Sequence, residues 1–298
     1  MSDDFLHRFQ LENAGVRGTL VRLNQSWGQI LENGNYSEPL ANLLGQTVAA
    51  SALFTSTIKF DGRLSIHLRD SGALKLLFAD CTHDGLLRGI ARWDGAQPQA
   101  PIQIDPLARL AITIENASTD TRYQGLVMAE GTHLSQAFEG YFERSEQLPT
   151  RIVLAASSDR CGGIMLQKIA GSGGTTPADA DGWNRVGHLL ATLTPRELLD
   201  LAPEPLLLRL FQEEGVRLQP AQPLAFRCTC SRDRVEDMLR SLGRAESDAT
   251  LAEQGSIEVT CEFCNRRYVF DERDVETVFA PAPASASASP TEPPATRH

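Results

Sequence analysis

The chain has 298 residues, of which 42 % are hydrophobic and 22 % charged, ordinary proportions for a globular protein of two or three domains. Its formal net charge of −10 at pH 7 argues against a nucleic-acid partner, since proteins that bind DNA or RNA normally carry a basic face. The N-terminus lacks the apolar run of a secretory signal, and the longest uncharged stretch, residues 39–58, is too rich in Asn, Gln, Ser and Thr for a membrane, so we expect a cytoplasmic protein.

Short strands joined by tight turns dominate residues 1–172, which we expect to form an N-terminal α+β core with antiparallel sheets. Strands are predicted as a hairpin over 9–23 with its turn at 13–15, and at 63–68, 74–78, 87–93, 110–114, 123–128 and 152–155. Helices are predicted at 26–32, 134–146 and 160–170.

One helix is expected at the centre of this core. The sequence Ser37-Glu38-Pro39 is typical of a helix start, because a capping residue is followed by proline in the first turn, and it predicts a helix to about Ile58. The segment carries apolar or small residues on every side and no charge before Lys59, which is the pattern of a helix covered all round. We therefore place this buried helix between the sheets.

Residues 173–225 are predicted to form a helical linker, entered through the Gly- and Thr-rich run at 171–178. Helices are predicted at 183–193, 195–201 and 205–214, the second of them opened by a capping box between Thr194 and Glu197. The third is more apolar than one buried face requires, so we expect the linker to rest on a sheet of the first domain. Residues 281–298 consist largely of Pro, Ala, Ser and Thr, and we expect a disordered tail.

Four of the six cysteines form two close pairs, Cys228-Thr-Cys230 and Cys261-Glu-Phe-Cys264. Four thiolates drawn from two short loops can surround one Zn2+ tetrahedrally at about 2.3 Å, which leaves no position for water or substrate. The pattern therefore predicts a structural or switchable zinc site rather than a catalytic one. Cys-x-x-Cys is the usual half-site, whereas Cys-x-Cys requires the backbone to curl more tightly.

Residues 226–280 are expected to be a small zinc-binding domain around these cysteines. We predict helices at 232–242 capped by Ser231, between Ser247 and Gly255, and at 272–279 capped by Asp271, with a β-hairpin that carries Cys-x-x-Cys at its tip. So few apolar residues cannot form a stable core alone, and the metal would supply the missing stability. Seven Arg, no Lys and twelve Asp or Glu between Cys228 and Phe279 argue against a zinc ribbon for DNA.

The other candidate sites have structural interpretations. Cys81 and Cys161 have no cysteine nearby in the sequence, and we expect buried, inert thiols. The run Ser145-Glu146-Gln147 has no accompanying base or metal motif, so it is interpreted as a polar anchor between a helix and a strand. No glycine-rich phosphate-binding loop is visible, so ATP dependence is not expected.

The cysteine motifs resemble a known family. Phe226-Arg-Cys-Thr-Cys-Ser-Arg-Asp-Arg and Ile257-Glu-Val-Thr-Cys-Glu-Phe-Cys-Asn look like the redox-switch domain of the bacterial redox-regulated heat-shock chaperones, the 33 kDa chaperonin family. Four segments of the first domain resemble the same family in matching order: Leu86-Leu-Arg-Gly-Ile-Ala-Arg92, Tyr123-Gln-Gly-Leu-Val127, Tyr141 to Thr150, and Gly163-Ile-Met-Leu-Gln167.

The resemblance implies an ATP-independent holdase rather than an enzyme. In the reduced form, Cys228, Cys230, Cys261 and Cys264 would bind one Zn2+ and the protein would be inactive. Oxidation would pair Cys228 with Cys230 and Cys261 with Cys264 and release the metal. The switch domain and the helical linker would then unfold, a homodimer would form, and the exposed apolar surface would hold unfolding client proteins.

Two alternatives use the same cysteines. A constitutive zinc-ribbon binding module would keep its metal, but Cys-x-Cys is awkward for it and the acidic charge is unfavourable. A thiol-disulfide oxidoreductase would use Cys261 and Cys264, but it needs an exposed thiol near a thioredoxin-like βαβ pattern, and none is visible in the sequence.

Overall fold

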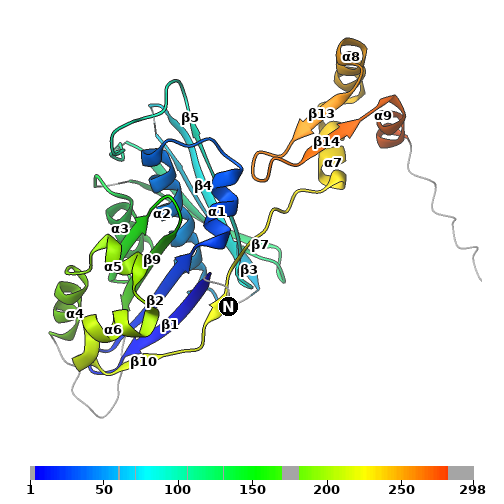
Figure 1. The fold of residues 1–298 in the computed structure, drawn as a ribbon. Helices are drawn as coiled ribbons and strands as arrows, with labels where there is room; N and C mark the ends of the chain where they lie inside the picture. The colour runs from blue at the N-terminus through cyan, green and yellow to red at the C-terminus, as the bar shows by residue number, and fades with distance from the viewer. Residues whose placement is uncertain are drawn as a thin grey trace, which may run out of the picture. The chain divides into compact units, whose positions relative to one another are not determined.

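The computed structural model describes residues 4–59, 61–70, 72–105, 107–129, 131–169 and 181–280 (Figure 1). The chain divides into two compact units, the first comprising Met1–Cys228 with Glu262–Cys264, and the second Thr229–Cys261 with Asn265–His298. The glycine-rich run predicted at 171–178 and the tail predicted at 281–298 lie outside the described residues. The four-part division drawn from the sequence, with boundaries after 172, 225 and 280, stays a prediction.

The first unit contains two β-sheets, and its mixed helix and strand content confirms the α+β class. The first sheet has the order β10-β1-β2-β9-β8, with β11 also paired to β1. Its strands are β1 (Phe5–Leu11), β2 (Val16–Leu23), β8 (Thr150–Ala156), β9 (Cys161–Lys168), β10 (Val216–Leu218) and β11 (Gln222–Pro223).

The second sheet has the order β12-β5-β4-β3-β6-β7. Its strands are β3 (Gly62–Arg69), β4 (Leu74–Thr82), β5 (Leu86–Trp93), β6 (Arg109–Asn116), β7 (Thr121–Met128) and β12 (Ala225–Phe226). The predicted antiparallel pairing holds for the strands of both sheets except β12, which runs parallel to β5 because it arrives from a distant part of the chain.

Helix α2 (Glu38–Thr55) lies between the two sheets, which confirms the buried position predicted from its uncharged sequence (Figure 1). It contacts β2, β8 and β9 of the first sheet and β3, β4 and β5 of the second. Glycines permit this close approach, since a Cβ at Gly89 would lie 2.6 Å from Val48 and one at Gly163 would lie 2.8 Å from Leu53. The helix ends at Thr55, three residues before the predicted end, and Ser37 occupies the N-cap without a side-chain hydrogen bond to the helix.

The helix predicted at 160–170 is wrong, because residues Cys161–Lys168 form strand β9. This strand pairs with β2 on one side and β8 on the other, and every residue except Lys168 is buried. A strand covered on both faces lacks the alternation of apolar and polar residues that identifies a half-exposed strand. A short segment of this kind has no period that distinguishes a strand from a helix.

Two further helices complete this core. Helix α3 (Leu134–Ser145) buries the five residues of its predicted apolar face and packs against β7 and β8. At its end the Tyr141 hydroxyl donates to Glu146 Oε1 at 3.2 Å, consistent with the polar anchor predicted there. Helix α1 (Gln25–Glu32) is capped from a distance by the Asp4 carboxylate, which accepts from the backbone N–H groups of Asn24, Gln25 and Ser26 at 2.5–3.0 Å.

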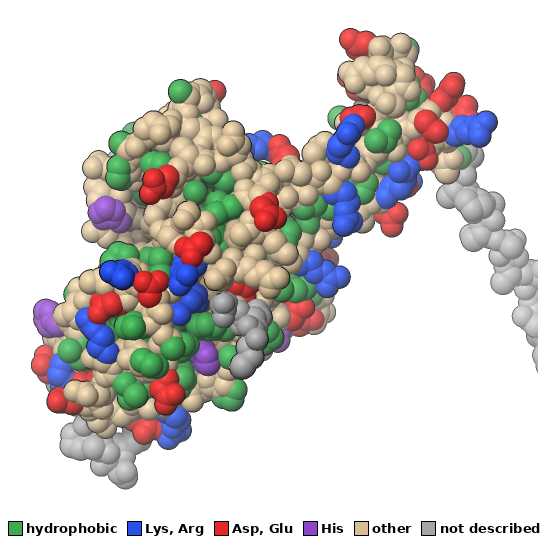
Figure 2. All heavy atoms as spheres, viewed as in Figure 1, with side chains coloured by type: hydrophobic (Ala, Val, Ile, Leu, Met, Phe, Trp, Pro, Cys, Tyr) green, Lys and Arg blue, Asp and Glu red, His purple; other side chains and the backbone are tan. Residues whose placement is uncertain are grey.

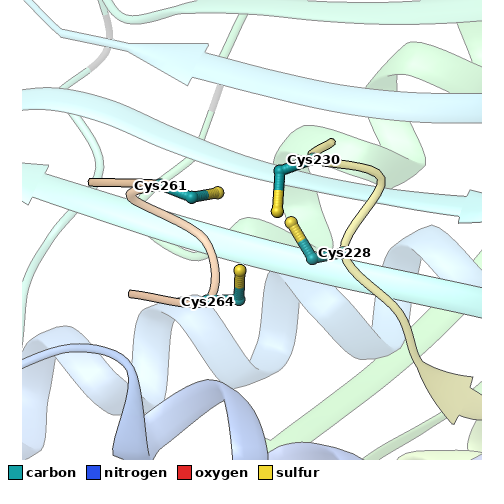
Figure 3. Close-up of side chains that lie close together, drawn as sticks. All are labelled: Cys228, Cys230, Cys261 and Cys264. Atoms are coloured by element: carbon teal, nitrogen blue, oxygen red, sulfur yellow. The ribbon is translucent and has the colours of Figure 1, made fainter. Parts of the chain in front are cut away.

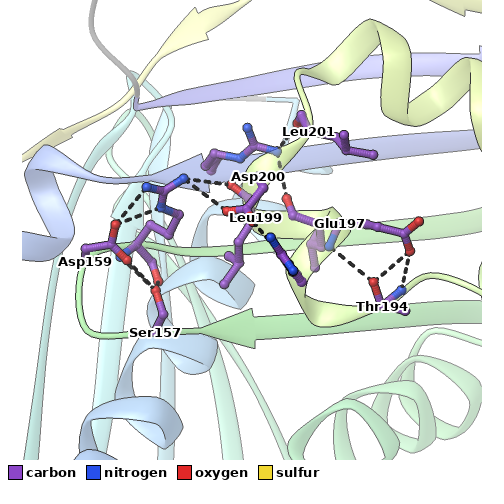
Figure 4. Close-up of polar contacts among 11 residues, drawn as sticks. Ser157, Asp159, Thr194, Glu197, Leu199, Asp200 and Leu201 are labelled. Carbon is purple, nitrogen blue, oxygen red and sulfur yellow. Dashed lines mark hydrogen bonds and ion pairs between the residues drawn. The ribbon is translucent and has the colours of Figure 1, made fainter.

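Helices α4 (Gly182–Leu190), α5 (Pro195–Asp200) and α6 (Pro203–Phe211), followed by a 3-10 turn at Gln212–Glu214, pack on the face of the first sheet opposite α2. This confirms the expectation that the linker rests on a sheet of the first domain. The capping box of Thr194 and Glu197 is present (Figure 4). Arg22 Nη2 donates to the carbonyl oxygen of Leu198 at 2.7 Å. Arg160 Nη1 lies 3.3 Å from Asp200 Oδ1, so polar contacts secure the edges of an apolar interface.

The second unit contains three helices and a hairpin. Its elements are α7 (Arg232–Leu242), α8 (Arg244–Gln254), β13 (Ile257–Thr260), β14 (Arg267–Phe270) and α9 (Glu272–Phe279). The caps predicted at Ser231 and Asp271 are both formed. Helix α8 begins at Arg244, so Ser247 is inside the helix instead of at its start, and its hydroxyl donates to the Gly243 carbonyl oxygen at 3.2 Å.

The core of the second unit is small. Seven hydrophobic side chains are buried together there: Val235, Leu239, Ile257, Tyr268, Phe270, Val275 and Val278. So few buried residues agree with the expectation that this unit needs a metal to stay folded. In the part of the chain that the structure describes, no helix has both the length and the apolar character needed to cross a membrane.

Candidate metal centre

Local turns position the two cysteine pairs. Cys228 and Cys230 lie between β12 and the Ser231 cap of α7, and Cys261 and Cys264 lie in the turn that joins β13 to β14. In that turn the Cys261 N–H donates to the Arg266 carbonyl oxygen at 2.9 Å, and the Asn265 N–H donates to the Cys261 carbonyl oxygen at 2.8 Å. Asn265 adopts the left-handed conformation with φ of 53°, which folds the chain back tightly after Cys264.

The four predicted ligands meet at one point (Figure 3). The sulfur atoms of Cys228, Cys230, Cys261 and Cys264 all lie within 4.8 Å of one another, and all four residues are partly exposed. Four ligands about 2.3 Å from one ion lie about 3.8 Å apart at the corners of a tetrahedron. A contraction of at most about 1 Å would therefore close this set around an ion, and a shell of four thiolates favours Zn2+.

A tyrosine contacts one of these sulfurs. Tyr268 on β14 donates its hydroxyl hydrogen to Cys230 Sγ at 3.1 Å, and this bond raises the pKa of Tyr268 above its ordinary value. Its ring belongs to the core of the second unit. Tyr268 therefore connects the sulfur cluster to the packing of this unit, a role that the sequence did not indicate.

An arginine of the first unit faces another sulfur. Arg88 on β5 forks onto the buried carboxylate of Asp80, with Nε 3.2 Å from Oδ1 and Nη2 2.9 Å from Oδ2. Burial lowers the pKa of Arg88, but the bonds to Asp80 and Cys228 outweigh it and raise that pKa overall. The guanidinium also lies 4.3 Å from the ring centroid of Phe263, which belongs to the same unit. The sequence did not indicate the contact of Arg88 with Asp80, because Asp80 lies two residues beyond the strand predicted at 74–78, whereas strand β4 continues to Thr82.

The remaining cysteines are not members of this sulfur cluster. Cys81 is 1 % exposed and Cys161 is fully buried, which confirms their predicted burial. Burial raises the pKa of the Cys81 thiol to about 12 and that of Cys161 well above its ordinary value. Both therefore stay protonated at neutral pH and are poor nucleophiles.

Comparison with known proteins identifies relatives of this chain in one family. The family model described as Hsp33 protein matches residues 4–271. A 33 kDa chaperonin of Nitrosococcus oceani is 44 % identical over 277 residues, covering 93 % of this chain and 94 % of the relative. One of Ectopseudomonas mendocina is 43 % identical over 289 residues, covering 95 % and 98 %. The crystal structure of a 33 kDa chaperonin from Thermotoga maritima has the same fold, with a TM-score of 0.77, 20 % identity, and coverage of 93 % of this chain and 97 % of that one.

Proposed function

This chain belongs to the Hsp33 family, and on that premise we propose that it is a redox-regulated chaperone that holds unfolding proteins without ATP. The observation that carries the proposal is the meeting of four thiols from two loops around one point, beside a unit whose described residues bury seven hydrophobic side chains together. A unit built in this way depends on its metal, so a change at the sulfurs changes its folding.

We propose that the reduced form is the inactive one. The metal ligands would be Cys228, Cys230, Cys261 and Cys264. Two of these sulfurs would also keep hydrogen bonds to the protein, Cys230 from Tyr268 and Cys228 from Arg88. When bound, Zn2+ would keep all four sulfurs ionised at neutral pH and hold the two loops together. Ionised sulfurs are the form that peroxide and hypochlorite attack, so the site is poised to react.

Oxidation would remove the ligands. Each neighbouring pair, Cys228 with Cys230 and Cys261 with Cys264, would lose two electrons to an oxidant of the peroxide class and form one disulfide. Two equivalents of peroxide would accept the four electrons and leave as water. Helices α7–α9 would then lose the metal that stabilises them, and the second unit would unfold.

The linker helices would expose the client-binding surface. Nine of the seventeen buried residues in the core under α4–α6 come from the linker itself, seven come from the strands of the first sheet, and Ala14 comes from the turn between β1 and β2. The chain runs from α6 through β10–β12 to Cys228, so unfolding beyond Cys228 would release the linker once the pairing of β10 and β11 with β1 and of β12 with β5 is also lost. The released apolar surface would bind unfolding proteins and a second copy of the chain, and a reducing compartment such as the cytoplasm would restore the resting state.

The test is a paired count of zinc and thiols with a client aggregation assay, before and after peroxide under mild heating. The expected result is loss of the four clustered thiols, release of one zinc per chain and suppression of client aggregation. The double variant Cys81→Ala, Cys161→Ala should behave in the same way, whereas Cys261→Ser, Cys264→Ser should neither hold zinc nor respond to oxidant.

Two results would contradict the proposal. A chain that loses zinc and thiols but leaves the client aggregating is not a redox-activated holdase. A chain that keeps its metal after oxidant and binds nucleic acid in a salt-dependent manner would instead be a constitutive zinc-binding module.

A further inference from the structure

A cavity of about 300 Å³ lies in the first unit, on the α2 side of the first sheet. It forms because α2 ends at Thr55 while the strands beneath it continue. Gln10 on β1, Arg17 on β2 and Gln167 on β9 are direct neighbours across three adjoining strands and form one wall. Arg8 lines the cavity on β1 and Lys59 lines it beyond the end of α2.

The charge of this cavity is unusual for the chain. Among the residues that the structure describes, thirteen line the cavity, and they include Arg8, Arg17 and Lys59 but no carboxylate. Over the whole sequence, 38 acidic residues outnumber 28 basic ones, and Figure 2 shows acidic and basic side chains interspersed on the viewed face. The three cations of the cavity therefore contrast with the mixed, net negative charge of the chain.

Uncharged acceptors hold the two guanidinium groups in place. Arg17 donates from Nε and Nη2 to Gln167 Oε1 at 3.1 and 2.9 Å, and the buried Gln167 amide in turn donates to Thr150 Oγ1 at 3.4 Å. Arg8 donates from Nη1 to Gln222 Oε1 at 3.0 Å and from Nε to the Ser56 carbonyl oxygen at 3.5 Å. These acceptors are neutral, so they do not offset the positive charge of either guanidinium. Each guanidinium also retains N–H donors for a ligand.

The C-terminal end of α2 reduces the positive potential of the cavity. A helix C-terminus carries roughly half a negative charge, and the Ser56 carbonyl already accepts from Arg8. Three full positive charges exceed that value, so the cavity stays electropositive. Its volume is at the lower limit for small-molecule pockets, which favours a small ligand.

We propose that this cavity binds a small oxyanion of the phosphate class, with Arg8, Arg17 and Lys59 as its cationic ligands. Phosphate offers several acceptor oxygens in a compact group, which suits charged donors that reach it from different sides. Both free inorganic phosphate and the phosphate end of a small metabolite have this chemistry. Occupancy stabilises the reduced fold, because Arg8 also holds Gln222 of the segment that returns along β1.

The test uses the full-length reduced, zinc-loaded protein, titrated with inorganic phosphate or glycerol phosphate at constant ionic strength set with chloride. Calorimetry and the thermal midpoint are the readouts, and neither depends on chaperone activity. Arg17→Gln and Lys59→Gln remove one charge each at exposed positions of the cavity, and Arg109→Gln removes the same charge at an exposed position of β6 outside it.

The expected result is saturable binding and a raised midpoint in the wild type and Arg109→Gln, with affinity weakened about tenfold in Arg17→Gln and Lys59→Gln. If only inorganic phosphate binds, the cavity is a site for the free anion. If glycerol phosphate binds as well, the cavity accepts the phosphate group of a small metabolite. The proposal is overturned if phosphate has no saturable effect beyond chloride, or if the cavity variants and Arg109→Gln lose equal affinity.

Discussion

Replacing Phe211 tests whether the packing of the linker keeps the chaperone inactive. Phe211 on α6 is fully buried in the core beneath the linker, and its ring stacks with Phe9 of β1 at a centroid distance of 6.4 Å. A buried Phe→Ala change costs about 3–5 kcal/mol, from lost apolar contact and the cavity left behind. A cost of 3 kcal/mol raises the population of undocked linker about 150-fold, since each 1.36 kcal/mol is a factor of ten.

The variant should therefore act without oxidant. Reduced, zinc-loaded Phe211→Ala is expected to suppress client aggregation partly, and hydrogen exchange should show faster exchange in α4–α6 with α2 still protected. The matched control is Leu208→Ala on the same helix, because Leu208 is 48 % exposed and its loss should cost less than about 1 kcal/mol.

Two outcomes would refute this reasoning. If exchange in α4–α6 rises and the client still aggregates, linker release is not the activating step. If exchange in α4–α6 does not change, the buried contact of Phe211 does not stabilise the docked linker.

Three further predictions concern stability. Cys261→Ser should lower the helical signal of α7–α9 while leaving α2 and the two sheets of the first unit protected from protease, and a second unit that stays folded without metal would contradict the role given to zinc. Asp4→Ala leaves three backbone N–H groups of α1 without their acceptor and should lower the free energy of unfolding by about 1–3 kcal/mol, measured by denaturant titration against Asp94→Ala, whose carboxylate is exposed. Burial raises the pKa of Cys81 from 9.0 to about 12, so the folded chain keeps a proton that the unfolded chain releases, and the free energy of unfolding should fall as pH rises from about 9 towards 12. That fall should be smaller in Cys81→Ala, and an unchanged pH dependence would show that Cys81 is not its source.

Several features of the site were predictable because they are local in the chain. Cys-x-Cys and Cys-x-x-Cys each bring two sulfurs to one turn, so only the meeting of the two pairs required the fold. The caps at Thr194, Ser231 and Asp271 join residues three positions apart, and all three are formed. The place of α2 followed from its composition, because a helix without charge on any side has to be covered.

Other features depend on residues far apart in the sequence. Strand β9 was predicted as a helix, since an apolar run buried on both faces has no period that separates the two structures. The contacts of Arg88 with Cys228 and of Arg17 with Gln167 join residues about 140 and 150 positions apart, and no local pattern indicates them.

The sequence by itself determined the two cysteine pairs, the caps and the buried central helix, because each depends on neighbours in the chain or on composition. Only the tertiary structure decided which strands enclose α2, which sheet the linker covers, and which arginines meet at the cysteines and at the electropositive cavity. The physical reason is that side chains on different strands become neighbours through sheet pairing, and that pairing is set by the packing of the whole unit.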